Sequence, residues 1–195
     1  MIKTNYLLVL LLLLVSCHQK SEKNPSASFS NSNQEDATFF PVTDFFKGQL
    51  VEIRERGIAP LKFTTNNNLT DSTSIKMDSL ETVVNDFINP SIDSLSLAKY
   101  YSVKKFFDQT LGFITLSYEA NQQLPENNPW LSWNVYIEPE KGDVAKIYLV
   151  KRDRPNKTLQ LSWNCKTHCS ITEITELSDN DTSFISRKET IKWKY

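Results

Sequence analysis

The chain has 195 residues, of which 22 are basic and 23 acidic, so its formal net charge is only −1. Nucleic-acid-binding domains normally carry a clear basic excess, and this near-neutral balance argues against that class. The four glycines are scattered singly along the chain, which excludes a Gly-rich loop of the kind that holds phosphate groups. The length fits one domain of ordinary size.

The first 17 residues have the three-part pattern of a secretion signal. Lys3 supplies a positive charge, and an unbroken apolar run covers Leu7 to Val15. This run is roughly half the ~20 residues of a transmembrane helix, which favours a signal peptide. The sequence Leu14-Val15-Ser16-Cys17 resembles the lipobox of bacterial lipoproteins. The resemblance implies cleavage after Ser16 and a lipid on Cys17; the alternative is an ordinary secreted protein with a chance cysteine.

The segment after Cys17 is polar and predicts a tether. Residues 17–38 contain almost nothing apolar, so they cannot bury enough surface to offset the entropy of ordering. Two or more acyl chains on Cys17 would hold the protein stably on a membrane. His18, and not Asp, follows the cysteine, which by analogy with Gram-negative sorting favours the outer membrane. We therefore expect a signal peptide at 1–16, a lipidated tether at 17–38 and a single domain at 39–195.

Helical patterns are confined to the first half of this domain. A helix is predicted from Asp44 to about Arg56, with Thr43 as its N-cap and Gly57 at its end. A second helix is predicted to start with a capping-box pattern at Asp78 and Glu81 and to stop at Asn89-Pro90. A shorter helical piece is expected within 92–98.

The rest of the domain has the sequence pattern of β-strands. A hairpin is predicted from 61–65 and 69–76, followed by seven short segments with strand character. Several of these alternate apolar and polar residues, which is typical of an antiparallel sheet with one buried face. The fold class predicted is α+β: a curved antiparallel meander of about six or seven strands, with two or three helices from the N-terminal half packed on one face. The segments are 101–108, 113–119, 131–137, 144–150, 159–163, 171–177 and 186–195.

Cys165 and Cys169 flank three residues that include His168. Outside the cytoplasm a cysteine pair usually forms a disulfide, so we expect a local disulfide or two free thiols. A zinc site needs four ligands, or three and a water, and the domain has no second histidine. We therefore expect no metal and no cofactor.

Two features are candidates for binding. Trp130 follows Pro129 in a polar loop and could be an exposed aromatic anchor. Lys151, Arg152 and Arg154 form a basic turn that could contact phosphates or an acidic partner. The alternatives are that the aromatic residues fill the core and that the basic residues form a solvated turn.

The stretch from Phe39 to Leu50, of the pattern FFPVTxFxxGQ, resembles the start of a group of small outer-membrane lipoproteins. The resemblance implies an envelope location and carries no catalytic residues. The leading hypothesis is a non-enzymatic binding or adaptor module that contacts another envelope protein. The second is a carrier with an internal cavity for a lipid or other apolar ligand, and an enzyme comes third.

Overall fold

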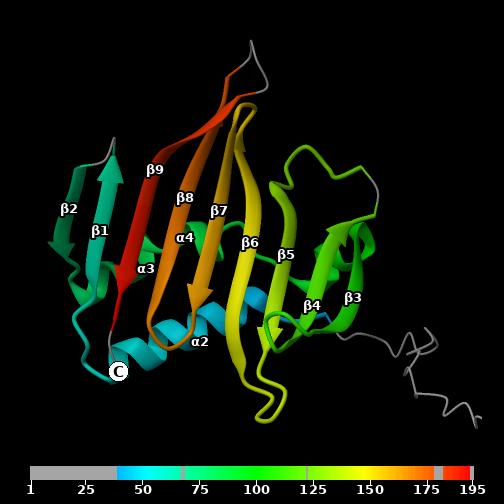
Figure 1. Cartoon of the computed structure of the whole chain (residues 1–195), viewed down its shortest axis with the longest axis horizontal. Helices are drawn as coiled ribbons and strands as arrows, with labels where there is room; N and C mark the ends of the chain where they lie inside the picture. The colour runs from blue at the N-terminus through cyan, green and yellow to red at the C-terminus, as the bar shows by residue number, and fades with distance from the viewer. Residues whose placement is uncertain (1–38, 67–68, 122, 178–181, 194–195) are drawn as a thin grey trace, which may run out of the picture. The chain divides into compact units, whose positions relative to one another are not determined.

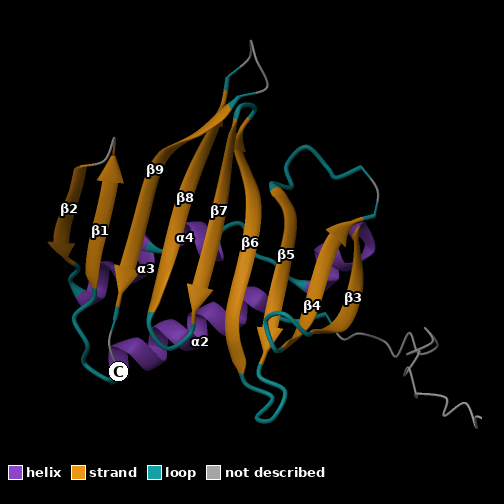
Figure 2. Ribbon diagram, in the orientation of Figure 1, coloured by secondary structure: helices purple, strands orange, loops and turns teal. Residues whose placement is uncertain are grey.

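The computed structural model describes residues 39–66, 69–121, 123–177 and 182–193. The predicted signal peptide, Cys17 and the tether lie outside the described residues. Within the described part, nine strands form one open, curved antiparallel sheet in the order β2-β1-β9-β8-β7-β6-β5-β4-β3 (Figure 1). The helices of the described residues lie on one face of this sheet, which confirms the α+β arrangement in outline (Figure 2).

Seven of the strands form the predicted meander. Each pairs with the next along the chain, from β3 at one edge to β9. Their bounds are β3 Tyr101–Asp108, β4 Phe113–Ala120, β5 Trp130–Ile137, β6 Val144–Arg154, β7 Lys157–Asn164, β8 His168–Glu176 and β9 Ser183–Lys192.

The strand count of six or seven was too low, because the predicted hairpin joins the same sheet. Its strands are β1 (Leu61–Asn66) and β2 (Leu69–Ser74). Strand β1 lies beside β9, with Leu61 opposite Lys192 and Thr65 opposite Lys188. Without this pairing β9 would be an edge strand with unpaired N–H and C=O groups. The hairpin therefore extends the meander by two strands and moves its edge to β2.

Helix α2 spans Val42–Glu55 and buries Phe46, Leu50 and Ile53, as the sequence spacing predicted. Gly57, at φ +65°, follows the helix end in the left-handed conformation that favours glycine. The predicted N-cap is wrong. The helix begins at Val42, and Thr43 lies in its first turn, where its Oγ1 accepts a hydrogen bond from the Ile92 N–H at 2.8 Å.

The second predicted helix is broken into three short pieces. They are a 3-10 turn (η2, Met77–Ser79), α3 (Leu80–Val83) and α4 (Asn85–Ile88). The break falls at Val84, whose φ of −99° and ψ of 16° are not helical. Two adjacent β-branched residues, Val83 and Val84, weaken the helix there. No side-chain capping hydrogen bond is present at η2, α3 or α4, so the capping box is wrong, although Leu80, Phe87 and Ile88 are buried as expected.

The expected short helical piece is present as α5 (Ser94–Leu97), followed by a 3-10 turn (η3, Ala98–Tyr100). It leads directly into β3. Together with α2, α3 and α4, the helical residues 94–100 form the layer that covers the buried face of the sheet.

Aromatic side chains fill the space between helices and sheet. Trp163 on β7 has its ring centroid 5.1 Å from Phe46 of α2, 5.2 Å from Phe87 of α4 and 5.1 Å from Trp193. A second cluster centres on Trp133, which stacks on Tyr118 at 4.8 Å and lies 4.4 Å from Tyr101. The alternating aromatic residues are thus core residues, the alternative that the sequence left open.

Trp130 is not an exposed anchor; its side chain is fully buried. The β5–β6 pairing shifts between Trp130 and Ser132, so that Trp130 and Trp133 lie on the same, helix-covered side of β5. The indole Nε1 donates a hydrogen bond to the Pro90 carbonyl at 3.0 Å. Trp130 therefore fixes the chain after α4 against the sheet.

Lys151 is not a turn residue, because β6 continues to Arg154. Alternation places Lys151 on the covered face after Ile147 and Leu149, and its side chain is only 8% exposed. Its ammonium donates to Asp86 Oδ1 at 2.8 Å, to the Asp86 carbonyl at 3.0 Å and to the Asn89 carbonyl at 3.1 Å. Cations are favourable at the C-terminal end of a helix, and Lys151 holds the end of α4 on the sheet in this way.

Replacing Lys151 by Met should destabilise the protein by about 2 kcal/mol, because three acceptors around the end of α4 lose a charged donor. Arg152→Met is the matched control; Arg152 is the next residue and is exposed, so its loss should change the free energy of unfolding by less than about 0.5 kcal/mol. Urea unfolding of both variants measures the difference. Equal stabilities would show that the Lys151 contacts do not hold α4.

Candidate ligand-binding groove

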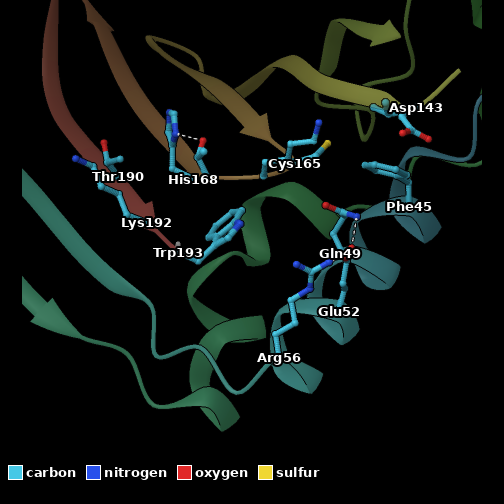
Figure 3. A pocket seen from close by; sticks show the side chains of 13 residues that line it. Phe45, Gln49, Glu52, Arg56, Asp143, Cys165, His168, Thr190, Lys192 and Trp193 are labelled. Atoms are coloured by element: carbon cyan, nitrogen blue, oxygen red, sulfur yellow. Dashed lines mark hydrogen bonds and ion pairs between the residues drawn. The ribbon is translucent and has the colours of Figure 1, made fainter. Parts of the chain in front are cut away.

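A groove of about 1070 Å³ lies between α2 and one end of the sheet (Figure 3). Helix α2 and the residue that follows it form one wall. The start of β6, the β7–β8 turn and the end of β9 form the other. The lining residues are Phe45, Gln49, Glu52, Arg56, Asp143, Val144, Cys165, Lys166, Thr167, His168, Thr190, Lys192 and Trp193.

The helical wall follows from residue spacing. Phe45, Gln49, Glu52 and Arg56 are four, three and four residues apart, which places them in one stripe along the helix. This stripe is adjacent to the buried stripe of Phe46, Leu50 and Ile53. Helix α2 thus presents one stripe to the core and the neighbouring stripe to the groove.

The sheet side of the groove is set by the tight β7–β8 turn. The Thr167 N–H donates to the Asn164 carbonyl at 3.1 Å, and the Trp193 N–H donates to the Thr167 carbonyl at 2.9 Å. The second bond places Trp193 beside the turn, where its ring packs on Trp163 and lines the groove. The position of Trp193 therefore depends on both the turn and the core.

The groove has apolar walls and a charged rim. Cys165 and Trp193 are 8% and 1% exposed, and Phe45 adds an aromatic side from α2. On the rim, Arg56 pairs with Glu52. Lys166 pairs with Glu138 at 3.2 Å; hydrogen bonds from Lys166 and Lys141 lower the pKa of that carboxyl.

Two buried polar atoms of the groove have no hydrogen-bond partner. The Gln49 amide nitrogen donates to Glu52 Oε2 at 3.0 Å, but its Oε1 is unpaired. The indole Nε1 of Trp193 is also unpaired. Both atoms are buried, so neither is open to a molecule in the groove as the structure stands.

Cys165 and Cys169 are free thiols in the structure, one of the two alternatives expected, and both are buried. Cys165 lines the groove, whereas Cys169 lies opposite Trp163 on β8 and is fully buried in the core. Burial raises the pKa of Cys165 to about 12 and also raises the pKa of Cys169. Neither thiol is therefore poised as a nucleophile at neutral pH.

His168 lies at the groove but is held by its neighbours. Its Nδ1 lies 2.8 Å from Thr167 Oγ1, and its Nε2 lies 3.1 Å from the Asn164 amide nitrogen. Burial, and then the charges of Lys192 and Lys146, lower its pKa. Among the described residues, no three His, Cys, Asp or Glu side chains come together as metal ligands would.

The basic residues predicted for binding do not belong to this groove. Arg152 and Arg154 are exposed, but they occupy the end of β6 opposite to Val144, which lines the groove. Sequence reasoning missed Phe45, Gln49 and Trp193 as site residues. The helical spacing of the first two was a weak signal, because it also describes an ordinary solvent-facing stripe.

No protein-family model, curated protein or solved structure matches the chain. The resemblance to small outer-membrane lipoproteins therefore stays an expectation. None of the described helices is long and apolar enough to cross a membrane.

The Cys165 thiol should react slowly with iodoacetamide in the folded protein at pH 8. Its pKa of about 12, against an ordinary value of 9.0, makes the thiolate rare. We expect alkylation at least about 100-fold slower than in the urea-unfolded chain. The raised pKa of Cys165 also makes the stability depend on pH. Above pH 9 the thiol ionises in the unfolded chain but not in the folded protein, so the free energy of unfolding falls as the pH rises. Mass spectrometry of the labelled peptide provides the readout, and rapid labelling would contradict the burial of Cys165.

Proposed function

We propose that this protein is a lipoprotein whose lipid on Cys17 anchors it to the outer membrane, and whose domain is a non-enzymatic binding module for another envelope protein. The observation that carries the binding role is the groove beside α2. Its apolar walls and charged rim match the features of protein-recognition sites, which combine an apolar centre with a polar border.

The filled core favours an adaptor over a carrier. A carrier needs an internal apolar cavity for its ligand. Here Phe46, Phe87, Trp163 and Trp193 pack on one another where the helices meet the sheet. A ligand would then bind at the surface, and the groove of about 1070 Å³ is a hollow there that is large enough to hold one.

The rim chemistry suits a peptide segment of mixed charge. Helix α2 contributes Glu52, the residue after it is Arg56, and the opposite wall contributes Asp143, Lys166 and Lys192. Both signs of charge are present on both sides of the groove. A segment of a partner protein offers the alternating polar and apolar groups that such a lining can accept.

The second candidate is a carrier that holds a lipid or other apolar ligand in the groove itself. The volume of about 1070 Å³ and the apolar side chains of Phe45, Val144 and Trp193 favour it. The two functions differ in the molecule found in the groove.

Photo-crosslinking in cells distinguishes them. A photoreactive residue at Lys166, on the groove rim, should give a discrete band with a protein partner. The same residue at Lys105, exposed on β3, should not. Thr167→Tyr, which fills the groove from an exposed turn position, should abolish the band; Thr110→Tyr, in the exposed β3–β4 turn, is its matched control and should leave it.

A lipid adduct at Lys166 in place of a protein band would favour the carrier. A band that survives Thr167→Tyr would contradict recognition in the groove.

Lipid attachment has its own test. Cys17→Ala should abolish palmitate labelling and release the protein from the outer-membrane fraction, because the acyl chains provide the membrane affinity. Cys165→Ala is the control and should keep the label. Labelled Cys17→Ala protein would contradict the anchor.

A further inference from the structure

The face of the sheet that the helices leave uncovered carries a row of basic side chains. Ile191 is buried under the helices, so the next residue, Lys192, lies on the opposite, open face. Lys192 lies opposite His168 on β8. His168 lies opposite Asn164 on β7, and Asn164 lies opposite Lys146 on β6. Figure 3 shows His168 pointing away from α2, as this pairing requires.

Two further cations lie on the same face. Lys188 is four residues before Lys192 on β9, and Arg152 is six residues after Lys146 on β6. Residues an even number apart share a face of a strand. Glu176 lies on this face at the far end of β8 and is not paired with any of the four cations. Among the described residues, no carboxylate forms an ion pair with the set that we call the cationic face: Lys146, Arg152, Lys188 and Lys192.

Other carboxylates of the sheet are already neutralised. Glu173 and Glu189 lie on the covered side, opposite core residues of the neighbouring strands. Glu173 pairs with Lys157 at 2.6 Å, and Glu189 pairs with Lys62 at 3.0 Å. On the open side of β4, Glu119 pairs with a lysine of β3 at 2.6 Å. The positive charge of the cationic face is therefore uncompensated, although the whole chain is close to neutral.

Aromatic rings support two of these cations. The ammonium of Lys146 lies 5.7 Å from the ring centroid of Tyr136, and that of Lys192 lies 5.0 Å from the ring centroid of Phe63. A ring attracts an ammonium but leaves its charge in place. After burial, the charges of Lys192 and Lys146 are the next causes that lower the pKa of His168 between them. The positive field thus extends across the row.

Exposed apolar side chains accompany the cations. Leu61 on β1 lies opposite Lys192 and is 46% exposed. Ile185, at the other end of β9, is on the same face and is 62% exposed. A soluble polyanion such as an acidic polysaccharide has no apolar phase for these two side chains. An anionic bilayer offers both phosphate groups and an acyl boundary, so it fits the whole surface.

We propose that the cationic face docks on an anionic bilayer, with its basic groups at the lipid phosphates and Leu61 and Ile185 at the acyl boundary. The choice of a bilayer rests on the proposed lipid on Cys17, which would hold the domain next to that surface. Salt screens such attraction, so docking orients the anchored domain and does not replace the lipid. In this orientation the helices face away from the membrane, and the α2 wall of the groove is open to a protein partner.

Vesicle flotation tests the docking with the protein from residue 17 onward carrying Cys17→Ser, which has no lipid. It should bind vesicles of phosphatidylcholine with about 30% phosphatidylglycerol, but not phosphatidylcholine alone, and salt should weaken the binding. Lys146→Gln with Lys192→Gln should weaken it at least about tenfold. Lys47→Gln with Lys105→Gln is the matched control, because both lysines are exposed away from the open face. The control should change binding by less than about twofold.

The apolar contribution has a separate pair of variants. Leu61→Ser should weaken vesicle binding about threefold. Leu69→Ser, on β2, removes a leucine that is more exposed but lies on the other side of the sheet, so it should have no effect. Equal effects of the two leucine variants, or of the two lysine pairs, would overturn the inference. Binding to dextran sulfate without binding to the vesicles would also overturn it and would make a soluble polyanion the partner.

The anchor and the docking fail separately. If Cys17 takes no palmitate but the unlipidated protein binds anionic vesicles, the proposed anchor fails and the docking stands. If Cys17 is labelled but the unlipidated protein does not bind the vesicles, the anchor stands and the docking is wrong.

Discussion

Trp163 on β7 packs against three aromatic side chains from other parts of the domain. It joins α2 through Phe46, α4 through Phe87 and the end of β9 through Trp193 to the centre of the sheet. Aromatic side chains of this size bury large apolar areas. Separating them would therefore lower the free energy of unfolding far more than the loss of a surface ion pair. This contact holds the buried stripe of α2 against the sheet. It therefore also determines that the adjacent stripe of α2 faces the groove.

The sheet provides the frame for this contact. Strands β3 to β9 pair in chain order, which brings the β7–β8 turn next to the end of β9, where the Thr167 carbonyl accepts from the Trp193 N–H. One wall of the groove is therefore built from backbone hydrogen bonds, and the other from a helix that the core holds in place.

The fold could largely be predicted from sequence because its signals are local. The spacing of Phe46, Leu50 and Ile53 gave α2, and the alternation around Trp133 and Trp163 gave two core strands. The errors fall where a long-range contact overrides the local pattern. Trp130 looked exposed because it precedes the strand predicted from 131, yet the shift in the β5–β6 pairing returns it to the covered side. Lys151 looked like a turn residue, although the alternation after Ile147 and Leu149 already placed it on the buried face.

The groove could not be predicted, because its walls are distant in the chain. Gln49 and Trp193 are brought together only by the packing of α2 on the sheet. The proposed adaptor function depends on the filled core and on the groove at the surface. Native mass spectrometry of the Cys17→Ser protein, purified from the periplasm without detergent, tests it most directly. An adaptor predicts a bare protein mass; a stoichiometric adduct of lipid mass would contradict the adaptor function and favour a carrier.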